Sequence, residues 1–379
     1  MLARDRKLAL WIFLVVPIFV ANFLVGLGTD LRRRGADDFN QLYVGAKLVF
    51  TGRLYDEPSV LRLERETIGV EKHDVVPTRL PFDYVLMWPL ARLPYGVAHT
   101  LWTALLICAA AGFVLLYPTK RRGELAAATC LSLPLAAGAI GIGQDVAVLL
   151  LVIAISLRLR AEGREVFAGS ALALLLIKFH LFLLIPVVLA LRREFRMLAG
   201  LCAGAVLLLA ISFSAGPDWP RQYLEVISRP AISPGTVGMP NLHGLVSELP
   251  HAGAIEAALS LGVTGLTVAC CFGAGLEAAF TAGLLGSFLL SRHSYLHDCA
   301  ILIPTVVWMF STKSKMLKVL AVLLATPFIY FLPPLLMRIR EGTLPALAII
   351  AALAAVASVA AEGYGSRRYP ESSTEAIQA

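Results

Sequence analysis

Charged residues are scarce in this chain, and their scarcity excludes a soluble globular fold. Only 16% of the 379 residues are charged, whereas 58% are hydrophobic. A soluble domain carries about one quarter charged residues. Leu and Ala runs recur along the whole length, so the apolar excess does not belong to one buried core. The composition therefore predicts an all-α, polytopic membrane helix bundle, in which each span needs roughly 20 apolar residues.

Cysteine is also sparse, and its placement predicts neither a disulfide framework nor a zinc site. Five of the six cysteines lie inside apolar segments, and Cys299 begins one. No CxxC or Cys/His ligand spacing is present. GxGxxG, P-loop and HExxH patterns are absent too, so no nucleotide site is predicted. We expect no cofactor and no essential metal.

The positive charge of the chain indicates membrane orientation rather than nucleic-acid binding. The formal net charge is +7, and short basic clusters at 120–122, 158–164 and 192–196 separate apolar runs. Clusters of Lys and Arg mark cytoplasmic loops. We therefore expect a multi-pass protein of the cell (inner) membrane, with both termini in the cytoplasm and no nucleic-acid partner.

Apolar length predicts about twelve membrane helices. They are expected near 8–28, 97–117, 125–142, 146–158, 166–191 (as two short helices), 197–215, 252–272, 274–290, 298–311, 316–334 and 344–361. The first run follows a basic start and lacks an A-x-A cleavage site, so it is expected to be a retained helix. Residues 1–365 are expected to form a single integral membrane domain, followed by a polar, disordered cytoplasmic tail over 366–379.

The longest polar stretch, residues 29–80, is expected on the outer side of the membrane. Within it, Phe39 to Thr51 reads as an amphipathic helix that lies in the interface plane. The following segment, Pro81 to Pro94, is apolar but short and bounded by proline. We expect it to be re-entrant or interfacial rather than spanning.

A lysine interrupts the apolar run at 166–191. Basic clusters flank this run on both sides, so both ends are expected in the cytoplasm, with two short helices meeting near Lys178 and His180 on the far side. A lysine among leucines at membrane depth needs a partner. Lys178 is either a phosphate contact or a structural lysine that snorkels or forms an ion pair.

Polar groups gather on one side of this topology. The expected topology places every polar group inside or just beyond the apolar segments on the non-cytoplasmic face: Asp37, Asp38, Asp83, Gln144, Asp145, Lys178, His180, Asn241, His243, His297 and Asp298. Ionisable groups at membrane depth face a cavity or a partner. The pattern predicts one outward-facing cavity that binds substrate.

Each of these groups also has a structural interpretation. Asp37 and Asp38 open a predicted helix, where an acidic residue serves as an N-cap or simply solvates a loop. Capping a tight hairpin explains Gln144 and Asp145 equally well. His297 and Asp298 begin a span and form a possible N-cap pair, while Asn241 and His243 follow a Pro- and Gly-rich loop.

In its motif order the chain resembles glycosyltransferase family 87, the polyprenyl-phosphate-mannose-dependent mannosyltransferases and their bacterial relatives. The residues that carry the resemblance are Asp38-Phe39, Tyr43, Ala46, Gly52 to Asp56, Trp88 to Tyr95, Trp102, Gly143-Gln144, Ala168-Gly169, Ile177-Lys178, Met239 to Asn241 and His297-Asp298. Two departures stand out: Phe179 and His180 follow Lys178 where the family often has proline, and Asp83 stands where many relatives have a second proline.

The resemblance implies a C-type glycosyltransferase fold with its active site facing the periplasm or exterior. It implies a polyprenyl-phosphate sugar donor, a glycolipid or glycan acceptor in the cell envelope, and inversion at the transferred sugar, with mannose as the expected sugar. It implies Asp38 as the catalytic base, with Asp37 as the alternative, and Lys178 at the donor phosphate. His180, two residues further on, is either a second contact to that phosphate or a loop residue. A secondary transporter or a lipid flippase is the alternative function.

Overall fold

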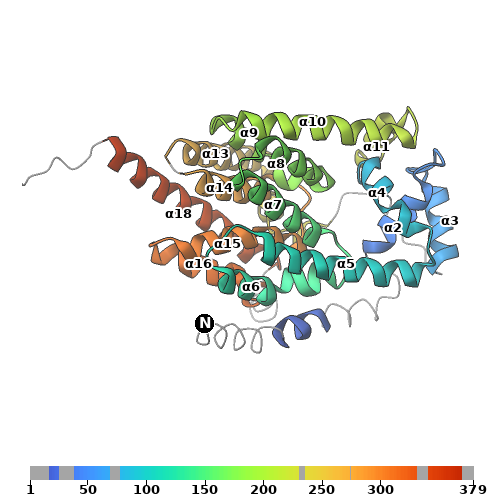
Figure 1. The fold of residues 1–379 in the computed structure, drawn as a ribbon, viewed down its shortest axis with the longest axis horizontal. Coiled ribbons are helices and arrows are strands. Elements are labelled where there is room, and N and C mark those ends of the chain that lie inside the picture. The colour runs from blue at the N-terminus through green and yellow to red at the C-terminus, as the bar shows by residue number, and fades with distance from the viewer. Residues whose placement is uncertain are drawn as a thin grey trace, which may run out of the picture. The chain divides into compact units, whose positions relative to one another are not determined.

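The computed structural model describes residues 17–24, 38–68, 77–229, 235–273, 275–330 and 340–368. Within these ranges every regular element is a helix, as the composition predicts (Figure 1). The chain divides into two compact units. One comprises residues 1–179, 196–235 and 296–303, and the other comprises residues 180–195, 236–295 and 304–379. The single functional domain over 1–365 stays a prediction.

The first unit contains most of the expected outer-side polar residues. Its helices are α2 (Asp38–Leu48), α3 (Glu57–Ile68), α4 (Pro81–Ala91), α5 (Tyr95–Leu116), α6 (Arg122–Leu131), η1 (Pro134–Ile140), α7 (Val146–Ala161), α8 (Glu165–Leu172), the start of η2 (Ala173–Phe182), nearly all of α10 (Phe195–Ser212), η3 (Phe213–Ala215), α11 (Trp219–Ile227) and η6 (Leu296–Leu302). The α5 and α7 helices pack side by side, and η1 packs against η6.

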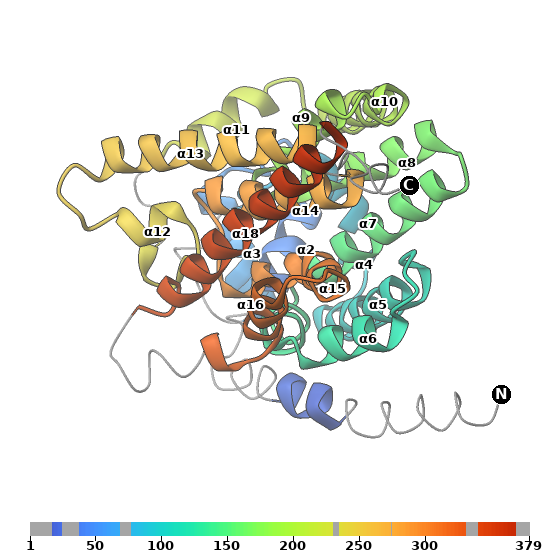
Figure 2. The same ribbon diagram turned by 90° about the vertical axis from the view of Figure 1, so that its left-hand side faces the viewer.

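The second unit is built around α13, α14 and α18, which pack against one another (Figure 2). Its helices are α9 (Ile185–Leu191), η5 (Thr236–Gly238), α12 (Leu242–Val246), α13 (Ala252–Gly273), α14 (Leu276–Leu290), α15 (Ile303–Ser311), α16 (Lys315–Ala325) and α18 (Thr343–Arg368). A Cβ on Gly273 would come within 2.4 Å of the Ala360 carbonyl oxygen. Glycine at this position therefore lets α13 approach α18 closely.

Four described helices are long and apolar enough to cross a membrane. They span Tyr95–Leu116, Phe195–Ala215, Ala252–Gly273 and Thr343–Glu362. A fifth span results if α6 and η1, which meet at 53°, are counted together. The membrane character is confirmed, whereas the number of twelve spans is not. Most of the expected first span and residues 369–379 of the expected tail lie outside the described residues.

The expected break at Lys178 is confirmed. Its backbone has φ −129° and ψ 55°, which interrupts the helical geometry of η2. Charge distribution predicted this break, because one straight helix would have carried a basic cluster to the wrong side. The lysine therefore lies at a bend rather than on a continuous helix face.

The expected one-sided amphipathic character of α2 is wrong, although the helix itself is present at Asp38–Leu48. The buried residues of α2 lie on more than one face of the helix, and Phe39 and Val44 among them are fully buried. Gly45 explains the second buried side, because a Cβ there would lie 2.3 Å from the ring of Tyr84 on α4. Burial by α4 thus covers a face that the pattern predicts to be exposed.

Candidate active site

Five buried charged residues form a continuous network in the first unit. Arg79 Nη1 contacts Asp83 Oδ2 at 2.9 Å and also pairs with Asp145. Lys178 Nζ lies 2.6 Å from Asp298 Oδ1 and 3.7 Å from Asp145 Oδ1. All five are less than 9% exposed. Buried charges require such partners, because desolvation of an isolated ion is costly.

Asp38 joins this network through Gln144. The amide Nε2 of Gln144 donates to Asp38 Oδ2 at 2.8 Å, while its Oε1 accepts from Arg79 Nη2 at 3.2 Å. A guanidinium only donates and a carboxylate only accepts, so the two partners define the orientation of the amide. Gln144 therefore links the half-buried Asp38 to the buried cations.

The backbone around Gly143 places Asp38 beside Gln144. The Asp38 N–H donates to the Ile142 carbonyl at 2.9 Å, and Trp102 Nε1 donates to the Gly143 carbonyl at 2.7 Å. Gly143 has φ +79°, and a Cβ there would lie 2.7 Å from Phe39 Cβ. Only glycine meets both demands without strain.

An aromatic cluster holds the first turn of α2 against α5. The ring of Phe39 lies 5.6 Å from that of Tyr95, 5.3 Å from that of His99 and 6.3 Å from that of Trp102. Such ring pairs contribute about 0.5–1.5 kcal/mol each beyond their buried area. Because Phe39 follows Asp38 directly, this cluster restrains the position of the carboxylate.

Arg79 is the central residue of the network, and the sequence analysis missed it. It stands at the end of a polar stretch that contains several other charged residues, and nothing local distinguishes it. Its spacing of four residues from Asp83 was the available signal, although Arg79 itself precedes α4, which begins at Pro81. The Tyr55 hydroxyl donates to the Arg79 carbonyl at 2.6 Å, which fixes the backbone at this point.

The two acids that share Arg79 differ in proton affinity. Burial raises the pKa of Asp83 to about 6, although Arg79 acts in the opposite direction. Burial also acts to raise the pKa of Asp145, but Arg79 and Lys178 hold it below its ordinary value. Asp145 thus keeps its charge to lower pH than Asp83, and Asp83 is the acid that gains a proton in mild acid.

His297 lies beside the Lys178–Asp298 pair. Its Nε2 is 3.5 Å from Asp298 Oδ2. His297 and Asp298 belong to η6, which packs against the π-helical turn η1. The approach is close, because a Cβ on Gly138 of η1 would lie 2.9 Å from His297 Cβ. π-Helical turns are frequent at functional sites. The structure therefore brings His297 and Asp298 to Lys178.

Three of the predicted site residues belong to the second unit. Asn241 caps α12, accepting from the Gly244 N–H at 2.7 Å and donating to Ser294 Oγ at 2.8 Å. His243 Nδ1 lies 3.0 Å from Glu256 Oε2. The ring of His180 packs edge-on against that of His293 at 5.8 Å.

Of the other predicted residues, Asp37 lies outside the described residues. The structure brings seven of the predicted residues into the network of the first unit: Asp38, Asp83, Gln144, Asp145, Lys178, His297 and Asp298. Across the described ranges, no group of three or more His, Cys, Asp or Glu side chains is arranged to hold a metal ion. The network thus contains one half-buried carboxylate, that of Asp38, and two buried cations that are paired with buried carboxylates.

Comparison with known families gives one match. Residues 81–297, more than half of the chain, match the sequence model of glycosyltransferase family 87. No curated protein and no solved structure matches the chain. The matched range includes Asp83, Gln144, Asp145 and Lys178, and it ends one residue before Asp298.

Proposed function

The chain belongs to glycosyltransferase family 87, and we propose that it transfers a mannosyl group from a polyprenyl-phosphate donor to an extracytoplasmic glycolipid or glycan. The transfer inverts the anomeric centre. It takes place on the periplasmic or outer face of the cell membrane, with both chain termini in the cytoplasm. Its apolar spans suit this role, because a lipid-linked donor keeps its tail in the bilayer and presents its head group at the interface.

The observation that carries the proposal is the link between Asp38 and the buried cations. Gln144 holds one oxygen of Asp38, Oδ2, and we assign the other oxygen to the acceptor hydroxyl. As the acceptor oxygen bonds to the anomeric carbon, its proton passes to Asp38. The bond from that carbon to the phosphate oxygen breaks, and polyprenyl phosphate leaves with the electron pair.

Lys178 is assigned to the departing phosphate. In the described structure it pairs with Asp298 and Asp145, so donor binding requires the phosphate to replace Asp298 as its closest partner. A compact ammonium at a bend suits this exchange, because it is a point charge with rotatable donors. His297, beside Asp298, and His180 are assigned as further contacts to the donor.

Arg79 and the remaining predicted residues receive supporting roles. Arg79, Asp83 and Asp145 orient Gln144 and Lys178 rather than contact the reacting atoms. Asn241 and His243 are assigned to substrate contact in the second unit. The proposal includes no metal, because a lipid phosphate is already an activated leaving group.

A membrane assay with radiolabelled polyprenyl-phosphate sugars tests the proposal. The expected result is a labelled product with a new glycosidic bond of inverted configuration. Movement of the labelled lipid between leaflets without a new bond would indicate a flippase instead. Labelling of cysteines introduced at positions 38, 144, 178 and 297 from both sides of the membrane would indicate a transporter, because a one-sided site is reached only from outside.

A further inference from the structure

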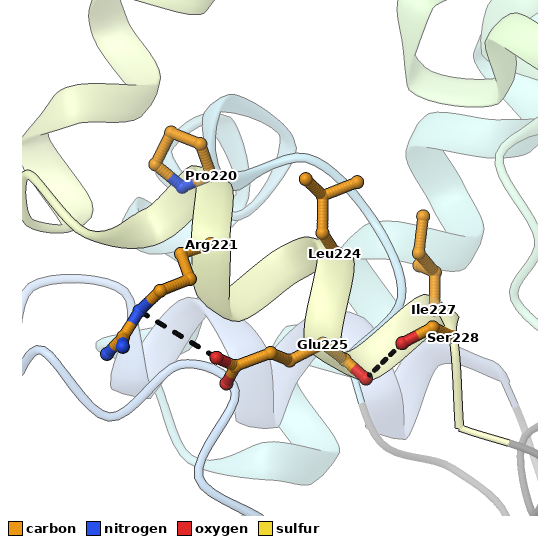
Figure 3. A pocket seen from close by; sticks show the side chains of 6 residues that line it. All are labelled: Pro220, Arg221, Leu224, Glu225, Ile227 and Ser228. Carbon is orange, nitrogen blue, oxygen red and sulfur yellow. Dashed lines mark hydrogen bonds and ion pairs between the residues drawn. The ribbon is translucent and has the colours of Figure 1, made fainter.

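The α11 helix carries two different faces. Pro220, Leu224 and Ile227 project to one side, whereas Arg221 and Glu225 lie on the other (Figure 3). Leu224 is 61% exposed and Ile227 is 46% exposed. Arg221 Nε and Glu225 Oε1 lie 3.7 Å apart. A short helix with one apolar and one charged face is suited to the boundary between lipid and water.

Two hollows adjoin α11, both within the first unit. The apolar one, an open hollow of about 730 Å³ along α11, is lined by Pro220, Leu224 and Ile227 together with Arg221, Glu225 and Ser228. The polar one, of about 530 Å³, lies between α11 and the turn before α3. Its polar lining comprises Arg53, Tyr55, Asp56, Gln222, Glu225 and Arg229. Glu225 borders both hollows, so the two adjoin on α11.

The position of α11 in the chain suits a place at the membrane boundary. It begins at Trp219, shortly after the candidate span Phe195–Ala215 ends. A row of aromatic rings begins at the end of this span. The ring centres of Phe213 and Trp219 are 5.8 Å apart, those of Trp219 and Tyr223 are 6.4 Å apart, and those of Tyr223 and Tyr55 are 5.9 Å apart. Trp and Tyr are enriched at this depth because one end of each ring is apolar and the other is polar.

The charges of the polar hollow select an uncharged, hydroxyl-rich group. The lining contains two guanidinium groups, those of Arg53 and Arg229, and two carboxylates, those of Asp56 and Glu225, so the hollow has no excess of either sign. Arg229 Nη1 is further engaged by Glu57 Oε2 at 3.0 Å. A phosphate would meet carboxylates, whereas sugar hydroxyls both donate to carboxylates and accept from guanidinium and amide N–H groups.

We propose that these two hollows bind a glycolipid, with its carbohydrate head in the polar hollow and its hydrocarbon tail along the apolar face of α11. The inference rests on the proposed function, for which it supplies the acceptor site. Tyr55 connects the two sites, because it lines the polar hollow and its hydroxyl donates to the Arg79 carbonyl. Through Tyr55, a head group in the polar hollow is thus linked to Arg79 of the network that holds Asp38.

Cysteine protection tests this site without requiring catalysis. Gln222→Cys places a thiol in the polar hollow, and Glu66→Cys on α3 is the matched exposed control. Both are made in the full chain in lipid nanodiscs, with the exposed Cys108 and Cys202 replaced by Ala. The rate of labelling by a charged maleimide is measured with octyl α-mannoside, octyl β-glucoside, octyl β-galactoside, methyl α-mannoside and octyl phosphate, all below micelle-forming concentrations.

We expect at least one octyl glycoside to slow labelling of Gln222→Cys at least fivefold, at a concentration at least tenfold below that needed for methyl α-mannoside. Labelling of Glu66→Cys stays unchanged. Protection by octyl phosphate at equal or lower concentration, equal protection of both cysteines, or no protection by any octyl glycoside would overturn the site. Leu224→Ser should raise the protective concentration of the glycoside, because it removes tail contact alone.

The same measurement with Asp38→Asn separates the two proposals. Protection of Gln222→Cys that persists in Asp38→Asn supports the glycolipid site whether or not transfer occurs. Absence of protection of Gln222→Cys in the otherwise unchanged chain, together with normal transfer by the parent enzyme, refutes the site and leaves the glycosyltransferase proposal intact.

Discussion

Gln144 donates a hydrogen bond from Nε2 to Asp38 Oδ2 across 2.8 Å, although 106 residues separate the two in sequence. The same amide accepts from Arg79, which is itself held by two buried carboxylates. The orientation of the half-buried Asp38 is therefore set by a chain of groups that reaches into the interior.

Replacing the proposed base should abolish transfer without unfolding the protein. Asp38→Asn keeps the size and still accepts from Gln144, but it does not take a proton from the acceptor. We expect transfer to fall by at least about 100-fold, the usual contribution of a general base. Asp218→Asn, an exposed acid that precedes α11, is the control and should retain activity. Turnover by Asp38→Asn near the parent rate would refute the assignment of the base.

Removing the amide should lower the rate through Asp38. Gln144→Leu deletes the donor to a charged acceptor, an interaction that contributes about 1.5–3 kcal/mol. We expect kcat to fall about ten- to hundredfold, with little change in KM for the donor. In Asp38→Asn the same substitution should cause no further loss of transfer. Full additivity of the two losses would show that Gln144 acts independently of Asp38.

A double-mutant cycle separates the catalytic from the structural role of Lys178. Lys178→Gln leaves Asp145 and Asp298 buried with one cation fewer, and it should reduce stability by about 3–5 kcal/mol. Lys178→Gln combined with Asp298→Asn restores the charge balance, so most of the stability should return. Transfer should stay lost in the double variant because the phosphate has no ammonium partner. Recovery of transfer along with stability would assign Lys178 a purely structural role.

Gly143 should not tolerate a side chain. Gly143→Ala combines a positive φ with a clash against Phe39, and it should cost about 1–3 kcal/mol and reduce transfer by displacing Asp38. Gly123→Ala in α6 is the matched control, because its Cβ would meet nothing within 4 Å. That substitution should be neutral or stabilising by about 0.4–1 kcal/mol. Thermal unfolding monitored by tryptophan fluorescence measures both.

Asp83 should make stability depend on pH in mild acid. Its pKa is raised in the folded state from 3.8 to about 6, so the folded protein binds the proton more tightly than the unfolded chain does. Its contribution therefore favours folding most below about pH 4 and falls as the pH rises to about 6, by about 3 kcal/mol in all. Relative to the parent, Asp83→Asn should gain stability over this window. A constant difference between the two melting temperatures from pH 4 to 7 would contradict the assignment.

The long apolar helices and the break at Lys178 follow from the sequence because they depend on local composition. A run such as Tyr95–Leu116 is apolar throughout, and two basic clusters that flank one run demand a turn between them. The bend between α6 and η1 was not expected, because a continuous run of apolar residues does not indicate the position at which a helix bends.

The connections within the site are less accessible to sequence reasoning. Asp38, Gln144, Lys178 and Asp298 were selected because each is polar beside apolar residues. Which partners they contact depends on packing between distant segments. Arg79 illustrates the limit: its contacts with Tyr55, Gln144 and Asp145 join residues 24 to 66 positions apart, and its own sequence neighbours do not reveal them.

The separation of 120 residues between Lys178 and Asp298 has a consequence for biosynthesis. Ribosomes add about 5–20 residues per second, so Asp298 emerges roughly 6–24 s after the lysine. Throughout that interval the nascent chain holds an ammonium whose closest native carboxylate has not been translated. Until η6 is translated, Asp145, which lies 3.7 Å from the lysine, is its available counter-ion, and Asp298 adds the closer partner afterwards.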